Sequence, residues 1–228
     1  MPKLFYLLSA SDDRDGARLR DALCSDVSRR VRAVGGREVV VFAADEAVAA
    51  GRPVRRSDPP LRAMLSFHID EVDARADVEA VLGALVRAPL VGYRVEETRP
   101  LEPRRPRGQR ADGMTQVSCI ARRPDLEPAE FLRRWQRDHE RVALETQSTV
   151  GYVRNAILET LVGRAPTAWS AIVEESFPIE ALTDREAFFD AASPEEADAR
   201  LARMLESCRR FMRLDAIEVT FVSVYDLG

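Results

Sequence analysis

The sequence runs twice through one order of elements, and this repetition limits the fold more than any other feature. Apolar periodicity predicts strand, helix, strand, strand, helix, strand in each half of the chain. In the first half these elements are predicted at 4–10, 17–34, 37–43, 62–69, 76–87 and 91–98. In the second half they are predicted at 116–121, 128–146, 152–159, 168–177, 185–191 with 194–212, and 216–225.

The two halves also correspond residue by residue. A shift of 112 positions places Leu19 on Phe131, Leu23 on Trp135 and Val27 on His139, and a shift of 110 places residues 66–70 on 176–180. Two ferredoxin-like βαββαβ repeats in tandem explain this pattern. Each repeat would leave one face of its sheet bare, so the two sheets can close face to face. We therefore predict an α+β fold in which two ferredoxin-like repeats form an intramolecular α/β barrel.

This organisation divides the chain into three parts. Residues 1–98 form a degenerate first repeat, and residues 114–228 form a second repeat that carries the site. Between them, residues 99–113 contain three prolines, two glycines and the arginine-rich run 104–107. Pro, Gly and charged residues together are typical of a connection between domains. We interpret this segment as a solvated linker.

Composition excludes several classes of protein. The chain has 228 residues and a net charge of −4, whereas nucleic-acid-binding surfaces carry a basic excess. No apolar run approaches the ~20 residues of a membrane span, and residues 4–8 are too short for a signal-peptide core. We expect a cytoplasmic protein that binds neither nucleic acid nor membrane.

Few residues are suited to cofactor chemistry. The cysteines Cys24, Cys119 and Cys208 are widely spaced, which favours reduced thiols over disulfides or a metal site. Lys3 is the only lysine and begins a strand, and no GxGxxG or GxSxG motif is present. We expect no metal and no cofactor.

The helix at 128–146 carries one of the two histidines on its buried face. Phe131, Trp135 and His139 recur at a spacing of four, so the imidazole points inward beside the indole. Such a histidine is either a hydrogen-bonded core residue or a proton-transfer group. Glu174 and Glu175 are adjacent in a strand, so they point to opposite faces and one of them needs a buried partner.

The second half resembles the EthD family of dimeric α/β barrels over residues 114–227. The resemblance rests on several motifs: Arg122-Arg123-Pro124, the helix from Phe131 through Trp135 to Asp138-His139, the strand Gly151-Tyr152-Val153-Arg154-Asn155, Glu174 with Phe177, and Phe188-Phe189. The first half matches in pattern alone, because Val27 stands in place of His139 and Met64 in place of Glu174.

The resemblance implies a pocket in the second repeat. There His139 would move a proton, Glu174 would orient it and tune its charge, and Asn155 would bond a developing oxyanion. The substrate would contact Trp135, Tyr152, Phe131 and Phe177. Packing or sheet-edge roles are the alternatives for Tyr152, Asn155 and Trp135, and His68 is either a pocket residue or a partly exposed residue at a strand end.

These expectations lead to a function. The first candidate is a cofactor-independent lyase or cyclase that decarboxylates, dehydrates or cyclises a small apolar aromatic or polyketide-like metabolite of secondary metabolism through an enolate-like state. One alternative is a cofactor-free monooxygenase that forms a quinone, and another is a non-catalytic carrier of a hydrophobic metabolite. We expect a monomer that is a pseudo-dimer, or a weak homodimer.

Overall fold

Eight antiparallel strands close into a barrel in the computed structural model, which describes residues 1–12 and 14–228. Around the barrel the order is β1-β3-β2-β8-β5-β7-β6-β4. The strands are β1 (Lys3–Ser9), β2 (Arg37–Ala43), β3 (Leu61–His68), β4 (Val91–Leu101), β5 (Met114–Ile120), β6 (Gly151–Val162), β7 (Ala171–Phe177) and β8 (Glu218–Asp226). The predicted α+β class is confirmed.

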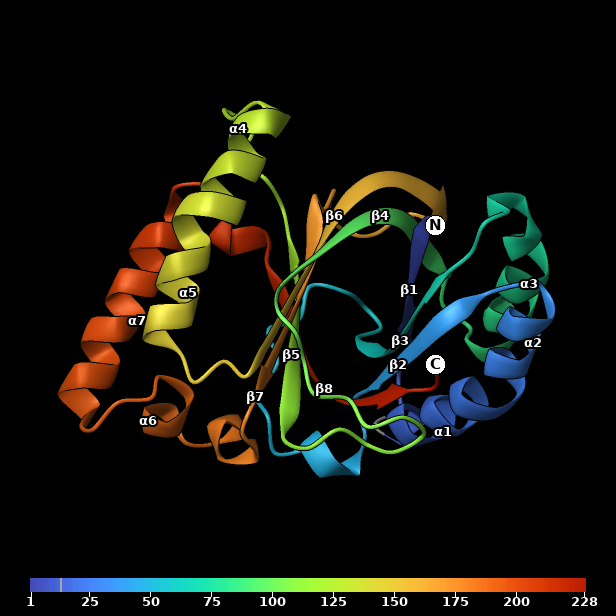
Figure 1. Ribbon diagram of the computed structural model, residues 1–228, viewed down its shortest axis with the longest axis horizontal. Coiled ribbons are helices and arrows are strands. Elements are labelled where there is room, and N and C mark those ends of the chain that lie inside the picture. Colours follow the sequence, from blue (N-terminus) through green and yellow to red (C-terminus); the bar gives the residue numbers. More distant parts are fainter. Residues whose placement is uncertain (13) are drawn as a thin grey trace.

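Helices cover the barrel on two opposite sides (Figure 1). One side carries α1 (Asp15–Ala22), α2 (Ser28–Ala33) and α3 (Ala76–Leu85). The other carries α4 (Pro128–Arg133), α5 (Glu140–Thr146), α6 (Arg185–Phe188) and α7 (Pro194–Arg209). Short 3-10 turns lie at Glu46–Val48, Val72–Arg75, Ile179–Leu182 and Leu214–Ala216. No helix in the described part of the chain is both long enough and apolar enough to cross a membrane.

The alternation of side chains along each strand produces three buried layers. On β1, Leu4 and Tyr6 pack under α1 and α3, whereas Phe5 and Leu7 face the barrel interior. On β7, Val173 packs under α4 and α7, whereas Ile172 faces the interior. The barrel interior, called here the lumen, is therefore a filled core between two helix layers.

Two pairs of strands join the first half of the chain to the second. β4 pairs with β6 and β2 pairs with β8, and both pairs are antiparallel. Within each half the strand orders correspond, since β4-β1-β3-β2 is matched by β8-β5-β7-β6. The first helix of each half also contains a π-helical turn, at Leu23–Val27 and at Arg134–His139. A shift of 112 positions places the first π-helical turn within the second.

The segment 99–113, predicted to be a solvated linker, is exposed at Arg104 and Arg107 but also makes contacts with the barrel. β4 continues through Leu101, and farther along the chain the amides of Gly108 and Ala111 donate to the carbonyls of Asp226 and Val224. The Arg105 side chain is only 10% exposed because it reaches a buried carboxylate. The composition of the segment predicted a connection between the two halves, but it could not predict these contacts with distant strands.

Candidate functional site

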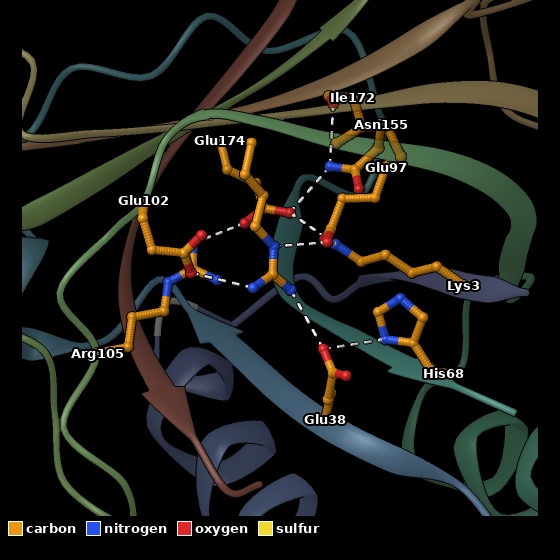
Figure 2. Close-up of polar contacts among 10 residues, drawn as sticks. Lys3, Glu38, His68, Glu97, Glu102, Arg105, Asn155, Ile172 and Glu174 are labelled. Carbon is orange, nitrogen blue, oxygen red and sulfur yellow. Dashed lines mark hydrogen bonds and ion pairs between the residues drawn. The ribbon is translucent and has the colours of Figure 1, made fainter. Parts of the chain in front are cut away.

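A cluster of charged residues fills one end of the lumen (Figure 2). We call Lys3, Glu97, Arg105, Asn155 and Glu174 the lumen ion cluster. Glu174 is 0% exposed in its side chain and accepts hydrogen bonds from Arg105 Nη2 at 2.7 Å, Asn155 Nδ2 at 2.9 Å and Lys3 Nζ at 3.3 Å. Lys3 also pairs with Glu97. The cluster joins β1, β4, β6 and β7 to the segment after β4.

The partners of Glu174 keep it ionised. Burial alone would raise the pKa of Glu174, but the charges of Lys3 and Arg105 and the bonds from Arg105 and Asn155 lower it to about 2. A carboxylate with this pKa is a poor proton acceptor near neutral pH. Glu174 and Asn155 are thus brought together as predicted, in an arrangement suited to holding the barrel end closed.

His68 lies beside this cluster at the end of β3. Its Nδ1 is 3.5 Å from Glu38 Oε2 (Figure 2). Glu38 also pairs with Arg99. Burial lowers the pKa of His68, while the charges of Glu38 and Glu97 oppose that shift. The interpretation of His68 as a partly exposed residue at a strand end agrees with its position.

His139 lies in the helix layer of the second half. It is 7% exposed, its Nδ1 is 2.9 Å from Ser207 Oγ, and its ring centroid is 4.8 Å from that of Phe211. Burial lowers the pKa of His139 to about 4, so the imidazole is neutral. Trp135 and Phe131 stack at 5.6 Å in the same cluster, which also contains Tyr152.

The predicted contact between His139 and Glu174 is wrong. β7 turns Glu174 into the lumen and Glu175 toward the helix layer, and Asn155 and Tyr152 divide between the two faces of β6 in the same way. Phe177 is separate again, since it packs with Met114 and stacks on Phe188 at 4.7 Å.

Glu175 is the carboxyl group on the helix-layer face of β7. It is 8% exposed, lies opposite Tyr152 and Gln116 in the sheet, and accepts a long hydrogen bond of 3.4 Å from Gln116 Nε2. Burial raises the pKa of Glu175 to about 7. The described cavities of ligand size do not reach this carboxyl group.

A third buried glutamate does reach a cavity, at the opposite end of the barrel from the lumen ion cluster. Glu218 begins β8, and it accepts hydrogen bonds from Ser57 Oγ at 2.6 Å and Ser57 N at 3.2 Å. Burial raises the pKa of Glu218, although the Ser57 bonds oppose this shift. The adjoining space of about 400 Å³, called here the Glu218 cavity, is within the range of small-molecule sites.

The walls of the Glu218 cavity combine apolar and charged side chains. Leu61, Val48 and Phe221 are apolar, Thr220 adds a hydroxyl, and Arg62 and Asp45 add buried charges of opposite sign. Sequence reasoning missed Glu218, because its only local signal is a glutamate at the start of an apolar strand. In the described ranges 1–12 and 14–228, no group of His, Cys, Asp and Glu side chains is arranged to hold a metal ion.

Comparison with known proteins supports the fold. No family model matches the sequence, and no curated protein is significantly similar to it. An anthrone oxidase-like protein aligns with 100% of this chain and 93% of its own at a TM-score of 0.59 and 11% identity. A proposed monooxygenase from Fusobacterium nucleatum aligns with 100% of this chain and 95% of its own, at a TM-score of 0.52 and 13% identity.

A mutant chlorite dismutase from Candidatus Nitrospira defluvii covers 99% of this chain and 92% of its own, at a TM-score of 0.53 and 11% identity. At such low sequence identities these structural similarities show the fold alone, and function must be argued from the site. The chain therefore shares its barrel fold with these three proteins.

Proposed function

We propose that this protein is a cofactor-independent monooxygenase that oxidises a small phenol-type aromatic metabolite in the Glu218 cavity. The observation that carries the proposal is a buried carboxyl group with a raised pKa in the wall of a ligand-sized cavity. A carboxylate with a raised pKa is a stronger base than an ordinary one, and bases of this kind concentrate at active sites.

The fold relatives favour oxidation over the lyase or cyclase reaction expected first. Their names include an anthrone oxidase-like protein and a proposed monooxygenase. Enolate formation is common to both reaction classes, so the same base would serve either one. Oxygen consumption separates them.

The reaction balances with dioxygen as the only oxidant. Glu218 would take a proton from the activated CH₂ of an anthrone-type substrate, and the wall that holds Arg62 would favour the enolate charge. The enolate passes two electrons to O₂, a C–O bond forms, and the peroxide takes the proton from Glu218. Loss of the second C–H proton and cleavage of the O–O bond then give a ketone and water.

The test is oxygen uptake with anthrone as the probe substrate. We expect Glu218→Gln to lower turnover about 100-fold or more, the range typical of general-base catalysis. The matched control is Glu159→Gln, because Glu159 is an exposed strand glutamate paired with Arg94. Unchanged oxygen uptake in a folded Glu218→Gln protein would contradict the proposal, and ligand binding without turnover in the wild type would favour the carrier alternative.

We interpret the two halves as tandem ferredoxin-like repeats related to the EthD family, divided at 1–98 and 114–228, in a cytoplasmic monomer. The matching strand orders and the two overlapping π-helical turns support the repeat. In this interpretation His139, Trp135, Phe131 and Tyr152 stabilise the second helix layer.

A further inference from the structure

A second cavity, of about 430 Å³, lies at the same end of the barrel as the Glu218 cavity. We call it the Trp169 pocket. It is bounded by the end of β1, by the chain before β3 and β4, and by the turn between β6 and β7. It shares Leu61 with the residues lining the Glu218 cavity, and Ser57 in its wall donates to Glu218, so the two cavities are neighbours.

The walls of the Trp169 pocket are mainly apolar and stiff. Leu7, Leu61 and Val91 belong to strands of the barrel, and three proline rings join them. These prolines are Pro59, Pro89 and Pro166. Side chains with few rotamers lose little entropy when they contact a ligand, so such walls suit a flat, rigid molecule.

Trp169 contributes a polar atom that needs a partner. The residue is 6% exposed, and its buried Nε1 has no hydrogen-bond acceptor in the described part of the protein. An indole N–H can only donate, and leaving a buried donor unpaired is unfavourable. The backbone N of Trp169 is bonded to Thr167 O at 2.9 Å, which holds the turn that carries this side chain. An oxygen atom on a bound molecule would supply the acceptor.

Arg164 supplies a charge in the same wall. Over residues 1–12 and 14–228 it has no ion pair or hydrogen bond, although the exposed Asp58 also lines the pocket. Gly163, which precedes it, has φ +70°, and a Cβ there would lie 1.9 Å from Leu90 O. The turn is therefore seated closely on the chain before β4, and it holds Arg164 at the rim. A guanidinium group matches a carboxylate in both charge and shape.

These features together define a ligand class. We propose that the Trp169 pocket binds an aromatic carboxylate, with the rings against the apolar wall, the carboxylate on Arg164 and a ligand oxygen accepting from Trp169 Nε1. The inference does not depend on the proposed oxidation, because Glu218 lines the other cavity.

The experiment is calorimetric titration of the 228-residue protein with 2-naphthoate. We expect Arg164→Gln to raise the Kd about tenfold or more, the effect of losing one charge-assisted contact. The same variant should leave the Kd of the uncharged methyl ester of this probe unchanged. Arg52→Gln is the matched control, because Arg52 is exposed, lies outside both cavities and carries the same charge.

Two further variants locate the bound probe. Trp169→Phe should weaken binding. Glu218→Gln should leave it unchanged, because the glutamine oxygen can still accept from Ser57, which lines the pocket. Full-strength binding to folded Arg164→Gln and Trp169→Phe proteins would overturn the inference, as would binding that only Glu218→Gln removes. The absence of any binding of 2-naphthoate to the wild type would also overturn it. Glu218→Gln should lose anthrone oxidation and keep naphthoate binding. The first result tests the proposed oxidation and the second tests the Trp169 pocket, so the two proposals can fail separately.

Discussion

Two adjacent glutamates show that the partners of a buried carboxyl group, rather than burial itself, decide its chemistry. Glu174 and Glu175 are both buried, yet the pKa of the first is about 2 and that of the second is about 7. Glu174 meets Lys3 and Arg105 in the lumen, whereas Glu175 faces a helix layer in which Gln116 is its hydrogen-bond donor. Two adjacent positions on β7 therefore hold one carboxylate that stays ionised and one carboxyl group that titrates near neutral pH.

Glu175 should make the stability of the protein depend on pH. Its pKa is higher in the folded protein than the ordinary value of 4.5, so the folded state binds more protons between these pKa values. Stability should fall as the pH rises from about 5 to 8. Glu175→Gln removes this titration. We therefore expect the variant's free energy of unfolding, relative to that of the wild type, to be higher at pH 8 than at pH 5 by up to about 3 kcal/mol. Urea denaturation at both pH values measures the difference.

The control for this measurement is Glu159→Gln, which replaces an exposed glutamate and should show almost no pH-dependent difference from the wild type. An advantage of Glu175→Gln that is equal at pH 5 and pH 8 would show that the side chain is not protonated on folding.

At this scale the sequence revealed positions but not partners. Strand alternation predicted that Glu174 and Glu175 face opposite sides, and the structure confirms it. Which of the two glutamates lies on the same side of the sheet as His139 depends on how β7 packs under the helices. The family resemblance pointed to Glu174, whereas Glu175 is the one on the helix side. The cations that fix Glu174 come from Lys3, 171 residues away, and from Arg105, 69 residues away. Neither contact has a local signal.

At the scale of elements, the segment after β4 acts as a strap across one end of the barrel. Arg105 anchors it to Glu174, and its Cζ lies 5.6 Å from the centroid of the Phe42 ring. The amides of Gly108 and Ala111 bond to β8 beyond this anchor. Strand and helix positions were predicted to within a few residues because periodicity is local. The contacts of the strap could not be predicted, because composition cannot show which arginine enters a core.

Removing the anchor should loosen this strap. Glu174→Gln leaves Lys3 and Arg105 without their shared anion, so the segment should open more often and expose the bonds after Arg104 and Arg107 to trypsin. We expect cleavage there to accelerate about tenfold, which corresponds to a loss of about 1.4 kcal/mol in local stability. Mass spectrometry of timed digests identifies the cut.

Glu159→Gln again serves as the matched control, since it breaks an exposed ion pair with Arg94 and leaves the strap in place. Equal rates of cleavage in the two variants would mean that the backbone bonds to β8 hold the segment without Arg105.

At the scale of the molecule, each half completes the sheet of the other. The barrel closes only where β4 meets β6 and where β2 meets β8, and both pairs join one half to the other. Separated halves would each expose two strand edges and the apolar face that fills the lumen, a combination that favours association. The repeated element order could predict this closure, because a four-stranded sheet with helices on one face needs a cover for the other.

The closure predicts how the protein behaves when its chain is cut. A specific protease site inserted between Arg107 and Gly108 would divide the chain near the middle of the strap without touching either strand pair. We expect the cut protein to elute at the volume of the intact protein in size-exclusion chromatography, because backbone ladders and the shared lumen core hold the halves together. The fragments should separate only in denaturant. Elution of two smaller species under native conditions would show instead that the covalent connection supplies most of the association, through the high effective concentration that it gives the two halves.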